Sequence, residues 1–223
     1  MPKSLAVIDA NRLTGPVPFD DLPVDPRPEM DRLGIQAACV THTLSLYSDP
    51  RAGNEALRKL DDPRLIPVPV VVPGEVEEPG AGMVRLCPRT HGFSLSGPIA
   101  SRWLADQERT VAVELDETTP AELLALALGS PRLRILLLNP GYRRLRAVAE
   151  LMAEAPNVWL EIGTVNTQRG VEWLASRFGA RRLVFGTGAP VLDDCGPRFL
   201  LDHLELDRDE LALVAAGTLK DLL

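Results

Sequence analysis

Two acidic residues and one histidine could carry out acid–base chemistry in this sequence. Glu114 and Glu161 each stand near the end of a short apolar run, where a strand would give way to a loop. A buried carboxylate can act as a general base when burial or a neighbouring charge moves its pKa. His91 lies in a loop just past another such run and is a candidate general acid. These three residues form the predicted catalytic set.

Arg85 and Arg89 belong to the same segment as His91 and could hold an anionic substrate. A small, soluble carboxylate would suit them better than a polymer. The alternative is structural, because Glu114 or Glu161 could pair with Arg85 inside the protein and take no part in a reaction. The sequence leaves both interpretations open.

Four further residues at expected strand ends are candidates for contact with a ligand: Asn11, His42, Asn139 and Gly188. His42 could equally hydrogen-bond a neighbouring loop. Gly188 belongs to the run RRLVFGTGAP, which stops abruptly at two glycines. A glycine at the end of a strand leaves room for close approach, so we expect open space at this point.

The chain alternates short apolar runs with longer helical patterns, as in βα units. Eight runs of strand length are bounded by Pro, Gly, Asp or Asn, at 4–10, 37–43, 65–72, 83–88, 110–116, 133–139, 157–163 and 182–187. Helical patterns occupy 28–34, 54–61, 98–107, 120–129, 142–155, 168–179, 197–204 and 208–223. The third connection, PGEVEEPGAG, is too broken by Pro and Gly for a full helix.

This alternation predicts an α/β fold, a compact (β/α)8 TIM barrel with a shortened or missing helix after the third strand. We expect a single domain over residues 1–223. An open, doubly wound sheet is the alternative architecture.

Strand alternation places the candidate residues relative to the barrel. In the fifth and seventh strands the branched apolar residues suit the outer face, which turns Glu114 and Glu161 inward. Asn139 ends the sixth strand on the same face as Ile135 and Leu137. Active sites of such barrels are built at the C-terminal ends of the strands, so we expect the two carboxylates and the amide to converge there.

The overall composition excludes several classes of function. The formal net charge of -7 gives no basic surface for nucleic acid or an anionic membrane. No segment resembles a signal peptide or a membrane span, so we expect a soluble, cytoplasmic protein. The three cysteines form no CxxC pair, which argues against a disulfide framework or a zinc knuckle.

The stretch APNVWLEIGTVNTQRGVEWLASRFGARRLVFGTGAPVLDD resembles the C-terminal half of amidohydrolase-related proteins, a branch of the amidohydrolase superfamily that contains metal-dependent hydrolases and decarboxylases. VTHTLSLYSDPRAGN and VRLCPRTHGFSL are also similar to segments of that branch. The resemblance runs from about Leu5 to Leu223 and is strongest over 157–190. It implies a (β/α)8 barrel.

The same comparison implies that the usual metal-binding residues are replaced. Where the family has Asp-x-His-x-His, this chain has Asp-Ala-Asn-Arg-Leu at 9–13. Asn139 stands in place of a later histidine, and Gly188 in place of the aspartate after the last strand. A catalytic metal needs about three nitrogen or carboxylate ligands, so we expect no metal and no other cofactor. A different metal site, formed by His42, His91, Glu114 and Glu161, is the alternative.

Three functions fit these observations. One is a metal-independent hydrolase or lyase acting on a small anionic molecule. Another is a non-catalytic protein of the same fold, a pseudoenzyme that binds a ligand or serves as a scaffold. A weaker alternative is a phosphate-binding aldolase. Gly186-Thr187-Gly188 resembles a short phosphate loop, which favours it, but no lysine stands at a strand end to form a Schiff base, which argues against it. A small molecule is the expected partner, and a homodimer is an open alternative.

Overall fold

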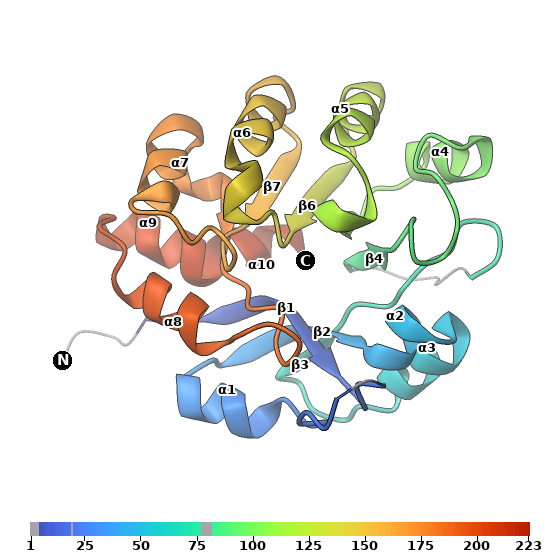
Figure 1. Ribbon diagram of the computed structural model, residues 1–223, viewed down its shortest axis with the longest axis horizontal. Coiled ribbons are helices and arrows are strands. Elements are labelled where there is room, and N and C mark those ends of the chain that lie inside the picture. The colour runs from blue at the N-terminus through green and yellow to red at the C-terminus, as the bar shows by residue number, and fades with distance from the viewer. Residues whose placement is uncertain (1–4, 19, 77–81) are drawn as a thin grey trace.

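Short parallel strands form the interior of the molecule (Figure 1). Within the residues that the structure describes, 5–18, 20–76 and 82–223, the computed structural model contains eight of them. They are β1 (Ile8–Thr14), β2 (Ala37–His42), β3 (Leu65–Pro67), β4 (Val84–Leu86), β5 (Thr110–Glu114), β6 (Arg134–Leu138), β7 (Val158–Glu161) and β8 (Leu183–Val184). Each overlaps one of the segments expected from the sequence.

The strands close into a barrel through two seams. Parallel ladders join β1 to β3 in one sheet and β4 to β8 in another. At the first seam, Val71 N donates to Arg85 O (3.0 Å) and Arg85 N donates to Pro69 O (2.9 Å). At the second, Ala10 N donates to Phe185 O (2.9 Å). A sheet bonded at both edges has no free edge, so the fold is the predicted (β/α)8 barrel rather than an open sheet.

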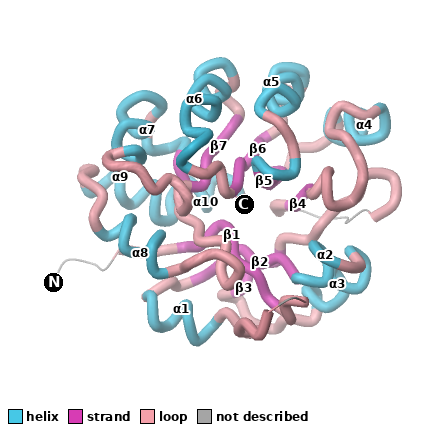
Figure 2. The backbone as a smooth tube through the Cα atoms, in the orientation of Figure 1, coloured by secondary structure: helices cyan, strands magenta, loops and turns pink. Residues whose placement is uncertain are grey.

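Helices surround the strands (Figure 2). They are α1 (Arg27–Leu33), α2 (Thr43–Tyr47), α3 (Pro50–Arg58), α4 (Pro98–Ala105), α5 (Pro120–Gly129), α6 (Leu145–Glu154), α7 (Gly170–Phe178), α8 (Cys195–Asp202), α9 (Arg208–Ala212) and α10 (Thr218–Leu222). Helix α5 begins with a typical N-terminal cap: Thr119 Oγ1 accepts a hydrogen bond from Glu122 N (3.2 Å), and Pro120 is the first residue of the helix. Among the described residues no helix is long and apolar enough to cross a membrane.

Helix α2 is the element that the sequence did not predict. It is only one turn long and begins at Thr43, a β-branched residue with low helix propensity. A side chain supplies its cap, because His42 Nδ1 accepts a hydrogen bond from Leu44 N (3.2 Å). A five-residue helix carries too little periodicity to be recognised in a sequence.

The connection from β3 to β4 lacks a full helix, as predicted, in the part that the structure describes. Residues 68–76 and 82–83 contain no helix. A turn closes on Val72, whose carbonyl oxygen accepts from Val76 N (2.8 Å). The remainder of the expected loop, 77–81, lies outside the described residues. Because no helix intervenes over residues 68–76, directly after β3, extended backbone at Pro69 and Val71 can bond to Arg85 and close the first seam.

Two layers of apolar side chains flank the barrel wall. Val113 and Leu160 pack outward in the cluster that contains Leu123 of α5. Ala112 and Leu138 face the interior with their neighbours from other strands. This alternation confirms the orientation predicted for the fifth and seventh strands, and it leaves the inward position at the C-terminal end of β5 to Glu114.

Asn157 ties the start of β7 to the turn between α5 and β6, and its removal should destabilise the barrel. Its Nδ2 donates to the carbonyl oxygens of Ala127, Ser130 and Leu133 at 3.2, 3.1 and 2.9 Å. Asn157→Ala removes all three bonds, two of them buried, so we expect a loss of about 2–4 kcal/mol in the free energy of unfolding. Urea denaturation measures it. Asn166→Ala, at an exposed position, is the matched control and should have little effect.

Candidate functional site

A cavity of about 150 Å³ opens at the C-terminal ends of the strands. Apolar side chains from the end of β1, from α2 and from the loop after β8 form part of its wall. Five residues predicted from the sequence line it together: Asn11, Arg85, Glu114, Asn139 and Gly188. The cavity lies where the active sites of such barrels are found. Most of the predicted ligand-contacting residues therefore share one site.

Arg85 is the central charge of this cavity. Its side chain is only 4% exposed. One guanidinium nitrogen donates to Asn11 Oδ1 (3.1 Å), and another forms an ion pair with the Glu114 carboxylate. Asn11 Nδ2 in turn donates to Asn139 Oδ1 (3.3 Å). The result is a continuous polar chain across the mouth of the barrel.

The guanidinium of Arg85 also retains an unused donor. Within the described residues its Nε is buried and has no hydrogen-bond partner. A second cavity, of about 60 Å³, is bounded by Cys87, Thr90 and Glu117 and shares the walls formed by Arg85 and Glu114. The ion pair thus separates two small cavities. A buried N–H without a partner costs free energy, so this donor favours a bound acceptor.

Asn139 reaches the cavity by a route that alternation does not predict. Continuing the β6 pattern would turn it away from the interior together with Ile135 and Leu137. Instead its φ of 45° is in the left-handed region, which redirects the side chain toward Asn11. Asparagine adopts this conformation more readily than most residues. The predicted convergence therefore depends on a backbone turn at Asn139.

Glu161 lies beneath the cavity and does not line it. The residue is 0% exposed. Its carboxylate accepts hydrogen bonds from Asn139 N (2.9 Å) and from Gly163 N. A Cβ on Gly186 would come within 2.6 Å of Glu161 Cγ, so glycine is required there. Burial raises the pKa of Glu161 to about 7, and the nearby charges of Asp9 and Glu114 act in the same direction.

A second polar network holds the second barrel seam. Asp9 is fully buried and accepts from Thr187 N (3.0 Å), from Thr187 Oγ1 (2.7 Å) and from an Arg12 guanidinium nitrogen (3.4 Å). Burial raises the pKa of Asp9, while Arg12 opposes that rise. Arg12 also pairs with Asp194 (3.2 Å), which Arg32 contacts from outside. Sequence reasoning missed Arg12 and Asp194, since only the Asp9-x-x-Arg12 spacing hinted at this pairing.

Three predicted site residues lie away from both cavities. His91 is half-buried in the turn after β4, and its N donates to Cys87 O (2.9 Å). Arg89 is exposed. His42 caps α2, and its ring packs over Gly15, where a Cβ would lie 2.6 Å from it. Burial lowers the pKa of His42. In this arrangement His42 follows the structural alternative, contact with a neighbouring loop, rather than contact with a ligand.

A family model described as "Amidohydrolase" matches residues 13–218. The chain belongs to the amidohydrolase family. No curated protein is significantly similar to it in sequence.

Solved structures share the fold along almost the whole chain. One is 5-carboxyvanillate decarboxylase from Novosphingobium aromaticivorans, complexed with manganese and 4-hydroxy-3-methoxy-5-nitrobenzoic acid (TM-score 0.74, 13% identity, 98% of this chain and 96% of that one). Another is Amidohydrolase 2 from Bifidobacterium longum subsp. infantis (TM-score 0.73, 16% identity, 98% of this chain and 98% of that one). A third is 2,6-dihydroxybenzoate decarboxylase from Rhizobium (TM-score 0.64, 12% identity, 97% of this chain and 98% of that one). At these identities the likeness shows the fold alone.

In this amidohydrolase, potential metal ligands come together at one place among the described residues. Within the described residues, the one group of at least three neighbouring His, Cys, Asp or Glu side chains is Asp193, Asp194 and Cys195, in the loop before α8. Guanidinium groups already contact it: Asp194 pairs with Arg12, and Arg32 donates to Cys195 Sγ (3.3 Å). These contacts leave the group poorly suited to a cation.

The raised pKa of Glu161 predicts a pH-dependent stability. Because its folded-state pKa of about 7 exceeds the ordinary value of 4.5, the folded protein holds this proton more tightly than the unfolded chain does. The resulting stabilisation is complete below pH 4.5 and is lost as the pH rises through about 7. In wild type this loss lowers the free energy of unfolding by up to about 3 kcal/mol as the pH rises, and Glu161→Gln should abolish that pH-dependent decrease.

Urea denaturation at several pH values from about 4.5 to 8 tests this, compared between wild type and Glu161→Gln. The pKa of Asp9 is also raised, and its charge is coupled to that of Glu161, so the difference between the two proteins reports on the pair. Identical pH slopes for the two proteins would show that Glu161 is ionised as in an unfolded chain.

Proposed function

We propose that this amidohydrolase-fold chain binds a small anionic molecule at Arg85 without a resident metal ion. The observation that supports it is the buried guanidinium, which borders both cavities with an Nε donor lacking a partner within the described residues. A carboxylate can take two parallel hydrogen bonds from a guanidinium, which makes it a natural ligand for such a group.

The size of the site favours a ligand of few atoms. The cavities measure about 150 and 60 Å³. Sites for drug-sized molecules are typically about 300–1,000 Å³. The proteins of similar fold carry names that refer to aromatic acids, 5-carboxyvanillate and 2,6-dihydroxybenzoate. A small organic acid is therefore the ligand class that we propose.

The residues at the family's metal positions do not fit a divalent cation. Asn11 and Asn139 offer neutral amide oxygens, and each is already in a hydrogen bond. Leu13 has no ligand atom. Gly188 has a φ of 72°, and a Cβ there would lie 2.7 Å from Leu192 Cδ1. The Arg85 guanidinium adds a fixed positive charge where a cation would need negative ligands.

The arrangement favours binding over catalysis. Glu161 accepts two backbone hydrogen bonds below the cavity, and His91 does not line it. A general base must lie within hydrogen-bond reach of the proton that it removes. These two residues therefore have no direct access to a ligand in the cavity, which supports the non-catalytic alternative.

A metal-independent hydrolase or lyase is the second candidate, and Glu114 supports it. Its carboxylate borders both cavities beside Arg85. An anion that takes the guanidinium for itself would release Glu114 from the ion pair. The freed carboxylate would then stand next to the ligand as a general base.

Substitution of Arg85 tests the binding proposal. Arg85→Lys keeps the charge but removes the planar fork and Nε, so the affinity for small monocarboxylates such as acetate should fall at least about tenfold. Isothermal titration calorimetry measures the affinity. Arg89→Lys, at an exposed position, is the matched control and should leave it unchanged.

The same titration should use protein prepared without a polyhistidine tag, and should include Zn²⁺ and Mn²⁺. Equal acetate affinity in wild type and Arg85→Lys would refute the role of Arg85. A tightly bound ion at one per chain would refute the metal-free part of the proposal, whatever the acetate result.

Glu114→Gln separates the two candidate functions. The side chain keeps its size and can still accept from Arg85, so acid binding should change by less than about tenfold. Because the variant lacks the counter-charge of Arg85, circular dichroism first checks that it is folded. If Glu114 is the base, turnover of a hydrolysable or decarboxylated acid should fall about a hundredfold or more. Unchanged turnover, or none in either protein across a panel of small acids, would favour the binding role.

A further inference from the structure

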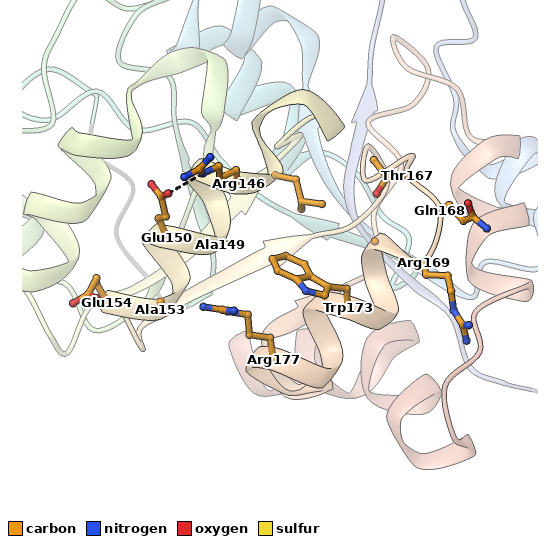
Figure 3. A pocket seen from close by; sticks show the side chains of 12 residues that line it. Arg146, Ala149, Glu150, Ala153, Glu154, Thr167, Gln168, Arg169, Trp173 and Arg177 are labelled. Atoms are coloured by element: carbon orange, nitrogen blue, oxygen red, sulfur yellow. Dashed lines mark hydrogen bonds and ion pairs between the residues drawn. The ribbon is translucent and has the colours of Figure 1, made fainter.

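A large, open cavity lies on the outer surface of the protein, between α6 and α7 (Figure 3). This α6–α7 groove has a volume of about 910 Å³. It is separate from the Arg85 site, because it faces away from the strands between two neighbouring helices. Most of the surface that lines it is apolar.

The floor of the groove is apolar. Ala149 and Ala153 of α6 and Gly170 of α7 leave space between the helices, and the ring of Trp173 lies between them (Figure 3). Trp173 is 42% exposed. A partly exposed tryptophan amid small residues is the usual composition of an anchor at a protein interface.

The two walls carry opposite charges at their C-terminal ends. Glu154 ends the α6 wall, and Arg177 stands near the end of the α7 wall with its guanidinium 5.8 Å from the Trp173 ring centroid. Neither has an ion-pair partner among the described residues. At the opposite end, Arg146 and Arg169 already pair within the chain, with Glu150 and Glu205 respectively.

This pattern is self-complementary under one symmetry operation. Helices α6 and α7 follow consecutive parallel strands and so run in the same direction. A two-fold axis along the groove would place α6 of each protomer over α7 of the other. Glu154 would then meet the Arg177 of a second copy, twice, and the two Trp173 rings would face each other across the axis.

We propose that the α6–α7 groove is the contact surface of a homodimer, with a second copy of this chain as its occupant. The two unpaired charges satisfy each other across the axis, and the tryptophans supply buried apolar area. The proposal does not depend on the activity of the Arg85 site, since no residue of the groove borders the two cavities at the mouth of the barrel.

Two charge reversals provide a specific test. Arg177→Glu chains would face glutamate with glutamate, and Glu154→Arg chains would face arginine with arginine, so each variant alone should dissociate. In an equimolar mixture, one protomer of each kind restores both opposite-charge contacts. Sedimentation velocity should show dimers for wild type and for the mixture, and native mass spectrometry should identify the mixed dimer.

A monomeric wild type, or a mixture that stays monomeric after both variants dissociate, would overturn the proposal. Variants that remain dimeric when alone would do the same. Circular dichroism checks that each variant is folded, and the substitutions are at exposed positions, which such changes tolerate.

Removal of the anchor gives an independent measurement. Trp173→Ala should raise the dimer dissociation constant at least about tenfold. Phe199→Ala is the matched control, because Phe199 is an aromatic residue that is 65% exposed on α8, outside the groove. An equal effect of the two substitutions, or none from Trp173→Ala, would place the dimer contact elsewhere.

Discussion

The mouth of the barrel depends on the ion pair between Arg85 and Glu114. Arg85 has two structural roles, since its backbone closes the seam between β3 and β4 and its side chain crosses the opening. A buried guanidinium without a counter-charge would destabilise the fold by several kcal/mol. Glu114 supplies that charge, and Asn11 and Asn139 extend the polar chain to the far wall. The shape of the cavity follows from this one pairing.

At the second seam, between β1 and β8, buried charge is also compensated, but by different groups. Asp9 is buried at the start of the barrel wall and is compensated by Arg12 and by both donors of Thr187. Glu161 is instead compensated mainly by backbone N–H groups and by holding its proton near neutral pH. The two buried acids, Asp9 and Glu161, thus differ in how their charge is compensated: Asp9 pairs with a guanidinium, and Glu161 holds its proton.

The sequence predicts the architecture well because strand length, bounding residues and alternation are local properties. It places Glu114 correctly on the inner face for the same reason. Alternation gives the face of a strand but not the depth along it, which is why Glu161 could not be located below the cavity. The turn at Asn139 is a backbone property that no pattern of side chains reports. His91 lies only four residues after Cys87, yet the direction of that turn takes it away from the opening.

The space above Gly188 restricts how this site can change. Leu192 fills the volume that any side chain at position 188 would need, and the backbone there is in a conformation that favours glycine. An acidic residue at 188 would therefore strain the backbone and require the Leu192 side chain to move. A side chain at position 188 and the present packing of Leu192 compete for the same space, so substitutions at the two positions should not have independent effects on stability.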